Sequence, residues 1–528
     1  MAGAATLFNG HEVIAPIVLP LVAGALLVLL EKVRSRWVPG VSLAATLLQL
    51  ILALVLVGQA STGETQAYLL GNWQAPYGIA LALDRLSALM LLLTTVVACG
   101  ALVYALGGDS VRGLHFHALF QFQLMGLAGA FLTADLFNLF VFFEVLLAAS
   151  YGLLLHGATR QRLRASVHYV VFNLTGSALF LVAVSLLYAL TGTLNMADLA
   201  LKVPALPPQD LRLALAAASL LLVVFAVKAA LLPLYFWLPE TYAGASAPVA
   251  ALFAIMTKVG VYAIARMTTL VFGPAWLGAA AMVLPTLALA TLVLAAVGVL
   301  AATQLRGLVA YLVVGSAGTL LLAMGLGTPG ALAAGLFYLV NSTLMAAAWF
   351  LIADRIAAAR GGVDRLDARV WSGGWAALGV AYFIAAVAAA GMPPLAGFFG
   401  KALLLQAAGQ TPLAVWVVAL VLGSSLAMMV ALARAGSTLF WKPAASASPV
   451  AAARAASPPA AAHTLAIVAL LGALLATSIG AGPLAAYTAA AAQQLTARKG
   501  YIDAVLGARA VAPAYDVRRE MRERGDAK

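Results

Sequence analysis

Long apolar segments, separated by short polar or proline-rich segments, recur along almost the whole chain. Segments of about 18 or more apolar residues, the length of a helix that crosses a bilayer, begin near Ile14 and end near Ala481. They number about 14 and leave no room for a large soluble domain. We therefore predict an all-α integral membrane protein with about 14 transmembrane helices.

The predicted helices follow these apolar segments. We place them at Ile14–Leu30, Val38–Val57, Ile79–Leu106, His117–Thr133, Leu136–Leu155, Leu163–Leu190, Leu211–Tyr242, Pro248–Val271, Leu277–Ala302, Leu308–Leu326, Ala331–Ile352, Ala376–Ala407, Leu413–Leu439 and Thr464–Ala481. The N-terminal sequence has no basic leader and no cleavage site, so we expect the first helix to be retained.

Two of the apolar segments contain a lysine and are interrupted by prolines. In Leu221–Tyr242 the lysine is Lys228, and in GMPPLAGFFGK it is Lys401. We assign the helix breaks to Pro233, Pro239, Pro393, Pro394 and Gly397. Proline removes a backbone donor, and non-helical backbone at membrane depth persists only where protein or water satisfies it. Paired interruptions at corresponding positions are typical of transporters built from inverted repeats.

Each interrupted segment is the fourth member of a set of five helices. We therefore predict two inverted five-helix repeats, formed by helices 4–8 and 9–13, with broken helices 7 and 12. The lysine precedes the break in the first set and follows it in the second, which inversion does not explain. The predicted units are three N-terminal helices (1–110), the first repeat (111–272), the second repeat (273–441), a flexible proline-rich linker (442–463), a last helix (464–492) and a charged, solvated tail (493–528).

Composition and charge agree with a membrane location. The 528 residues are 64% hydrophobic and 9% charged, with a mean hydropathy of +1.03, too few charges to cover a soluble surface. If the N-terminus lies outside, fifteen Lys and Arg residues fall on the cytoplasmic side and four on the other side before the tail. The net charge of +12 therefore reflects membrane topology and does not indicate nucleic-acid binding. The single cysteine, Cys99, excludes an intrachain disulfide and a multi-cysteine metal site.

Four ionisable residues fall at membrane depth, namely Glu144, Lys228, Lys258 and Lys401. Such residues are costly in a bilayer and usually mark an ion or proton pathway. Polar residues that could support such a path are His168, Ser246, Thr257, Ser316, Asn341, Ser342 and Thr343. By contrast, we interpret the adjacent Asp84 and Arg85 as a local ion pair with a structural role.

Three segments, TKVGVYAIAR, KAALLPLYFWLPETYAGASAPVAALFA and AGMPPLAGFFGK, carry a family resemblance. They resemble the antiporter-like subunits shared by Mrp-type multisubunit cation/proton antiporters and respiratory complex I. SAPVAALFAIMTKVGVYA and YIDAVLG look most like the D-type branch of the Mrp antiporters. The resemblance covers nearly the whole chain and implies fourteen helices, broken helices 7 and 12, and a polar axis at mid-membrane.

By motif position, the resemblance makes Glu144 the glutamate of helix five and Lys228, Lys258 and Lys401 the lysines of helices seven, eight and twelve. It also implies a bacterial inner-membrane location, partner subunits of the A, B, C, E, F and G types, contact with lipid, and protons and monovalent cations as substrates. Many relatives carry histidine or an extra lysine in helices ten and eleven. This chain has Gly315-Ser316-Ala317 and Asn341-Ser342-Thr343-Leu344 there, so a path through these helices depends on ordered water.

We hypothesise that a proton passes along Glu144, Lys228, Lys258 and Lys401 through water, with Glu144 approaching or leaving Lys228. Burial disfavours a charged amine and a nearby carboxylate favours it. The alternatives are a static Glu144–Lys228 pair that joins two helices, a structural scaffold, and the pumping module of a redox-driven complex I-like enzyme or membrane hydrogenase. We expect no cofactor and no enzyme chemistry, because no nucleophile, metal or phosphate motif is present.

Overall fold

The structure is a computed structural model that describes residues 10–33, 35–157, 159–273, 282–368, 371, 375–442 and 460–509. Within these ranges, 12 helices are long and apolar enough to cross a membrane. The shorter apolar helix Phe116–Leu132 supplies another span, and two half-length helices in 375–408 together supply one more. The prediction of a helical membrane protein with about 14 spans is therefore confirmed.

The bounds of the elements are as follows. The N-terminal part contains α1 (Ala15–Lys32), α2 (Val38–Ala60), β1 (Gln66–Leu69), β2 (Ala80–Leu83) and α3 (Arg85–Ala105). The first repeat contains α4 (Phe116–Leu132), α5 (Leu136–Leu155), α6 (Arg160–Thr191), the short α7 (Met196–Lys202), α8 (Pro208–Ala229), α9 (Trp237–Gly244), α10 (Ala247–Phe253) and α11 (Met256–Arg266). The second repeat contains α13 (Val283–Ala301), α14 (Leu305–Leu326), α15 (Pro329–Ala359), α16 (Trp375–Ala390), α17 (Ala396–Ala408) and α18 (Ala414–Gly436), and α20 (Ala461–Ile479), α21 (Ala481–Thr496) and α22 (Arg498–Leu506) follow.

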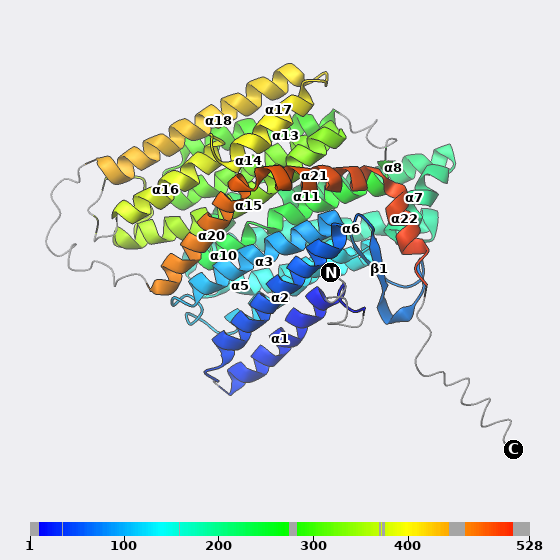
Figure 1. The fold of residues 1–528 in the computed structure, drawn as a ribbon, viewed down its shortest axis with the longest axis horizontal. Coiled ribbons are helices and arrows are strands. Elements are labelled where there is room, and N and C mark those ends of the chain that lie inside the picture. The colour runs from blue at the N-terminus through cyan, green and yellow to red at the C-terminus, as the bar shows by residue number, and fades with distance from the viewer. Residues whose placement is uncertain are drawn as a thin grey trace.

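The helices form one elongated bundle with α1 and α2 at one edge and α17 and α18 at the other (Figure 1). The broken helix α20–α21 runs across the bundle and packs against α15 and α3. The spans formed by α10–α11 and by α15 are fully buried, so the core lies where the two repeats meet.

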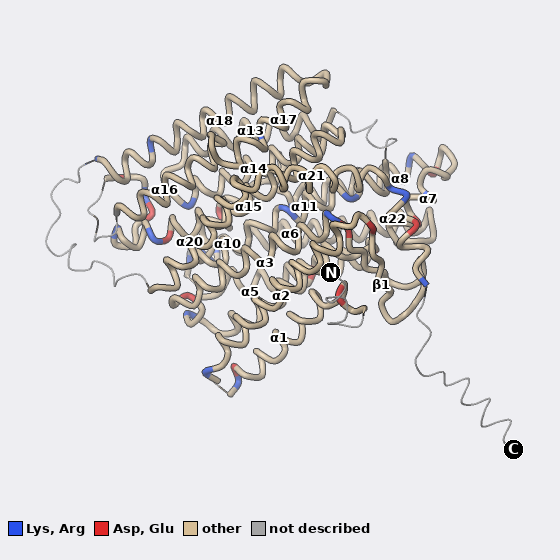
Figure 2. Tube along the Cα trace, viewed as in Figure 1, with Lys and Arg blue, Asp and Glu red and all other residues tan. Residues whose placement is uncertain are grey.

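Charged residues gather mainly at the two ends of the bundle (Figure 2). One end carries Arg112, Arg162, Arg306 and Arg360, and we call it the arginine end; it is the side predicted to be cytoplasmic. Its residues come together from distant elements: Arg162 donates to the Gly244 carbonyl at 3.2 Å, and Arg306 binds Asp354.

The two repeats are packed alike and point in opposite directions. In each repeat the first helix packs on the second, and the third helix packs on both halves of the broken fourth. The fifth helices end similarly, because Ala-Ile-Ala-Arg266 and Ala-Leu-Ala-Arg434 are both followed by a π-helical turn, Met267–Val271 and Ser437–Trp441. Arg266 lies opposite the arginine end, whereas Arg434 binds the Leu300 carbonyl near the start of α14 at the arginine end. The inverted repeats predicted from the sequence are present.

The third helix begins later than predicted. Residues 80–83 form β2, which pairs antiparallel with β1 in a short hairpin, and α3 begins only at Arg85. Asp84 ends the hairpin and caps α3 by accepting a hydrogen bond from the Ser87 amide at 2.8 Å. This N-cap fixes the start of α3.

The interpretation of Asp84 and Arg85 as a local ion pair is wrong. The Asp84 carboxylate instead pairs with Arg266 at 2.6 Å, and both side chains are buried. Arg85 donates to the Ser61 carbonyl at 2.9 Å. Arg266 sits over the rings of Tyr262 and Tyr501, so the buried pair joins α3, α11 and α22.

The segment after residue 492 is not wholly a solvated tail, as predicted. It continues α21 to Thr496 and then forms α22, in which Tyr501 and Val505 are buried. Most of the predicted linker, residues 443–459, and the end of the tail, 510–528, lie outside the described residues, as does the predicted start of helix nine at Leu277. The predicted unit boundaries stay a prediction.

Candidate proton-transfer site

The break in helix seven separates α8 from α9 at residues 230–236. Two polar contacts satisfy the backbone there: the Trp237 indole donates to the Val227 carbonyl at 2.9 Å, and the Leu232 amide donates to the Thr291 hydroxyl at 3.0 Å. Pro233 lies in the break as predicted, but Pro239 lies in the first turn of α9, where no intrahelical donor is needed. Pro239 therefore begins the second half-helix and does not interrupt it.

Helix eight is also irregular, which the sequence did not predict. Residues 254 and 255 separate α10 from α11 with tighter backbone bonds, from Ala254 to Ala251 and from Ile255 to Leu252. The Tyr242 hydroxyl donates to the Phe253 carbonyl at 2.7 Å and satisfies an acceptor that a regular helix would use itself. The irregularity lies just before Lys258 and leaves its backbone in a short i to i+3 turn.

Lys228 occupies the last turn of α8 and is buried. Its amine donates to the side-chain carbonyl of Asn173 on α6 at 3.0 Å and lies 5.8 Å from the centre of the Phe143 ring. A cavity of about 10 Å³ borders Lys228 and Asn173, with space for about one water. The lysine therefore has one protein acceptor and room for a solvent acceptor.

Glu144 is joined to Lys228 indirectly. Its carboxylate accepts a hydrogen bond from Ser177, which lies one helical turn from Asn173 on α6. Glu144 and Lys228 still interact electrostatically, yet in the described part of the chain no carboxylate lies within 4.0 Å of any of the three buried lysines. The structure thus shows a separated acid and amine, bridged by α6, in place of a closed ion pair.

Lys258 is completely buried at the contact between the repeats. Its amine donates to the Thr257 hydroxyl at 3.2 Å and to the Ser316 hydroxyl on α14 at 2.9 Å. Ser316 in turn donates to the Val313 carbonyl at 2.7 Å. Both predicted partners therefore face the lysine, and Ser316 links the first repeat to the second.

Lys401 lies in α17, after the break in helix twelve. Its amine reaches back to the carbonyl of Ala390, the last residue of α16, at 3.1 Å, and donates to the Ser425 hydroxyl at 2.8 Å. Lys228 also lies at the carboxyl end of the first half-helix, α8. The amines of both repeats thus occupy the same place, where the helix dipole favours a cation, although the order of lysine and proline differs.

Asn341 lies between these groups on α15 and is 1% exposed. Neither its amide nitrogen nor its carbonyl oxygen has a hydrogen-bond partner within the described residues. A side chain on Gly397 would come within 2.9 Å of the Asn341 amide, so Asn341 faces the break in helix twelve. Ser342 and Thr343 bond back to the Leu339 carbonyl of their own helix at 3.2 and 2.7 Å.

Two predicted path residues lie elsewhere. His168 is exposed on the outer face of α6, and Ser246 is buried at the start of α10, at the arginine end. The sequence-based set omitted Asn173, Ser177 and Ser425. Asn173 and Ser177 share one face of α6, whereas His168 and Thr175 share the opposite one.

Gly260 controls the distance between α11 and the end of α8. A methyl group there would lie 2.6 Å from the Ala229 amide and 2.8 Å from the Phe225 carbonyl. Since these are backbone atoms beside Lys228, we expect Gly260→Ala to push the half-helix away and lower transport several-fold, with a stability loss of about 1–3 kcal/mol. Gly472→Ala, at a position with no atom within 4 Å, is the matched control. Transport in membrane vesicles and thermal unfolding would be measured, and equal behaviour of the two variants would contradict the expectation.

The site lies within a segment that matches a known family. The description "NADH:quinone oxidoreductase/Mrp antiporter, TM" matches residues 133–427, more than half of the chain. The chain belongs to this family.

Relatives and solved structures agree with this membership. The chain is 42% identical to a probable K⁺/H⁺ antiporter protein of the D type from Rhizobium meliloti, over 94% of this chain and 98% of the relative, and 38% identical to a Na⁺/H⁺ antiporter protein of the D type from Bacillus subtilis, over 74% and 79%. A chain of the Mrp complex from Dietzia sp. DQ12-45-1b superposes with a TM-score of 0.85 at 28% identity, covering 95% of this chain and all of that one. A chain of respiratory complex I from Thermus thermophilus gives 0.75 at 26% identity, covering 92% and 99%.

Proposed function

We propose that this chain is the proton-translocating subunit of a multisubunit monovalent cation/proton antiporter. The observation that supports it is a row of three buried amines, each hydrogen-bonded to neutral oxygen atoms, with one carboxylate at the Lys228 end of the row. Intramembrane groups of this kind mark proton and ion paths. The two relatives given above are named as antiporter subunits, one for K⁺ and one for Na⁺, so the proposal leaves the cation general.

In the proposed mechanism, a proton moves between the amines through hydroxyl groups and water. Burial deprives an ammonium group of water that neutral hydroxyl and amide oxygens replace only in part, so each lysine can release its proton when a charge nearby changes. Movement of Glu144 toward Lys228, across the Ser177–Asn173 face of α6, would hold a proton on Lys228. Its return to Ser177 would release that proton toward Lys258.

The next steps follow the contacts of the second repeat. Ser316 faces Lys258 and can pass hydrogen bonds across the contact between the repeats. Asn341, whose polar atoms have no partner among the described residues, is the natural place for water between Ser316 and Lys401. Both helix breaks stand beside an amine, which leaves room for hydration and small movements there.

Partner subunits are part of this proposal. Glu144 lies near the middle of α5 and is only partly buried within this chain. A carboxylate at that depth is costly beside lipid, so we propose that a neighbouring antiporter subunit covers the α5–α6 face. The complex would lie in the bacterial inner membrane, with lipid around its remaining faces.

The test compares vesicles from cells that express the complete set of antiporter genes with and without this chain. We expect addition of Na⁺ or K⁺ to collapse a preformed proton gradient only when the chain is present. If the gradient instead depends on NADH or another electron donor and no cation exchanges for protons, the chain is the pumping module of a redox-driven complex and the antiport proposal fails. This readout separates a transporter from a redox enzyme, for which the sequence shows no cofactor motif.

A further inference from the structure

Several buried polar groups in the arginine-end halves of α4 and α5 have no hydrogen-bond partner among the described residues. They are the Nδ1 atoms of His117 and His156, the carbonyl oxygen of Gln121, both polar atoms of the Gln123 side chain and the hydroxyl of Tyr151. The two helices pack directly against each other. Buried polar atoms are normally paired with protein or with ordered water, so a group of unpaired ones in one region indicates internal water.

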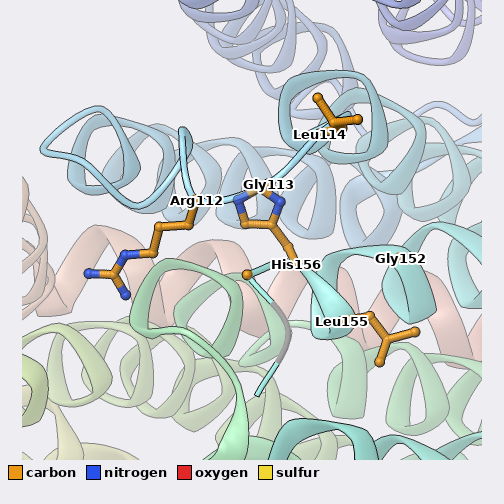
Figure 3. Close-up of a pocket in the computed structure, with 7 residues that line it drawn as sticks. Arg112, Gly113, Leu114, Gly152, Leu155 and His156 are labelled. Atoms are coloured by element: carbon orange, nitrogen blue, oxygen red, sulfur yellow. The ribbon is translucent and has the colours of Figure 1, made fainter. Parts of the chain in front are cut away.

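His156 stands at the outer end of this region, directly after α5. Its side chain lines an open pocket of about 510 Å³ formed with Arg112, Gly113, Leu155 and neighbouring residues (Figure 3). The Nε2 atom lies 3.0 Å from the Asp109 carbonyl, which can only accept, so Nε2 carries a hydrogen. In the neutral ring Nδ1 is therefore the basic atom, and it lies beneath Gly113, where a Cβ atom would approach it to 3.0 Å.

The surroundings of His156 suit a group that binds a proton briefly. Burial lowers the pKa of His156, the carbonyl groups of Asp109 and Leu114 oppose that shift, and the positive charges of Arg162 and Arg112 add to it. On the adjoining elements, the Asp109 carboxylate pairs with Arg112 at 2.9 Å, and Arg162 donates to the His156 carbonyl at 2.8 Å. The neighbouring histidine, His117 on α4, interacts electrostatically with His156.

The inner end of the region reaches Glu144. Tyr151 lies two turns along α5 from Glu144 and interacts with it electrostatically. On the same stretch of α5, the Ser150 hydroxyl bonds to the Tyr169 hydroxyl at 2.8 Å, and the Tyr169 backbone carbonyl accepts from the side-chain amide of Asn173, the partner of Lys228. His156 and Glu144 are 12 residues apart on α5, which is about 18 Å along a helix.

We propose that α4 and α5 enclose a hydrated proton passage from the arginine end to Glu144, and that His156 is the proton-binding group at its mouth. A hydronium ion in the pocket gives its proton to Nδ1, which forms an imidazolium ring and leaves water. The Nδ1 proton then passes to internal water and on to the Glu144 carboxylate, and the ring returns to its neutral form. Transfer in the opposite direction uses the same groups, so the passage serves uptake or release.

This inference rests on the proposed antiport function and is tested with the complete complex in vesicles. We expect His156→Gln to lower antiport roughly tenfold or more when the pH on the arginine-end side is alkaline. The loss should shrink as that side is acidified, because hydronium can then load the internal water directly. A purely structural defect would reduce the rate by the same factor at every pH. His168→Gln is the matched control, since His168 is exposed on the outer face of α6.

A second variant keeps the test decisive if His156→Gln assembles poorly. Tyr151→Phe removes only a hydroxyl, and we expect a smaller loss with the same dependence on pH. Wild-type profiles for both variants, or a loss independent of pH, would overturn the passage. If Lys228→Ala abolishes antiport while these variants do not alter it, the entrance alone is wrong; if Lys228→Ala is also active, the proposed function itself fails.

Discussion

Replacement of Lys228 by alanine is expected to abolish antiport, by roughly a hundredfold or more, while the complex still assembles. The change removes the titratable group at the break of helix seven and leaves the Asn173 carbonyl without its donor. A proton arriving at Glu144 then has no amine to continue to. Collapse of a preformed proton gradient by added cation, in inside-out vesicles and per amount of complex, measures the effect.

Lys228→Arg separates the relay from a static pair. Arginine keeps the positive charge near Glu144 but does not release its proton, so it would restore a static pair and would fail in a relay. We therefore expect Lys228→Arg to be as inactive as Lys228→Ala. Lys202→Ala, at a half-exposed lysine paired with Asp198 at 2.9 Å, should transport normally. Normal transport by either Lys228 variant would exclude the relay.

The buried amines could be predicted from the sequence because the signal is local. A lysine within a long apolar segment stands out without any knowledge of its neighbours, and Lys228, Lys258 and Lys401 are all buried in the fold. Their partners could not be found in the same way. In a membrane helix both faces are apolar, so the pattern on α6 does not tell whether the face of Asn173 or that of His168 turns inward.

Long-range contacts also decide the helix breaks and the outer end of the bundle. Prolines mark the breaks, but the indole of Trp237 and the hydroxyl of Tyr242, which satisfy the freed carbonyls, are ordinary aromatic residues in sequence. Asp84 illustrates the limit most clearly. Its neighbour Arg85 suggested a local pair, whereas its true partner Arg266 lies 182 residues further along the chain.

That partnership supports the second large expected effect. Asp84→Asn should destabilise the folded protein by about 3–5 kcal/mol, because it leaves the Arg266 guanidinium buried without a counter-charge. Asparagine is a good N-cap, so the start of α3 should be kept and the loss can be assigned to the charge. Denaturant unfolding of the purified complex in detergent measures the change.

A double variant distinguishes the cost of a lone buried charge from the net value of the pair. Arg266→Met alone should also destabilise, since it leaves Asp84 charged and buried, but Asp84→Asn with Arg266→Met removes both charges and should recover much of the loss. The half-exposed pair of Lys202 and Asp198 provides the scale, and Lys202→Met should cost less than about 1 kcal/mol. If Asp84→Asn costs no more than Lys202→Met, then water reaches Arg266 in the folded protein, and the pair does not hold α22 against α3 and α11.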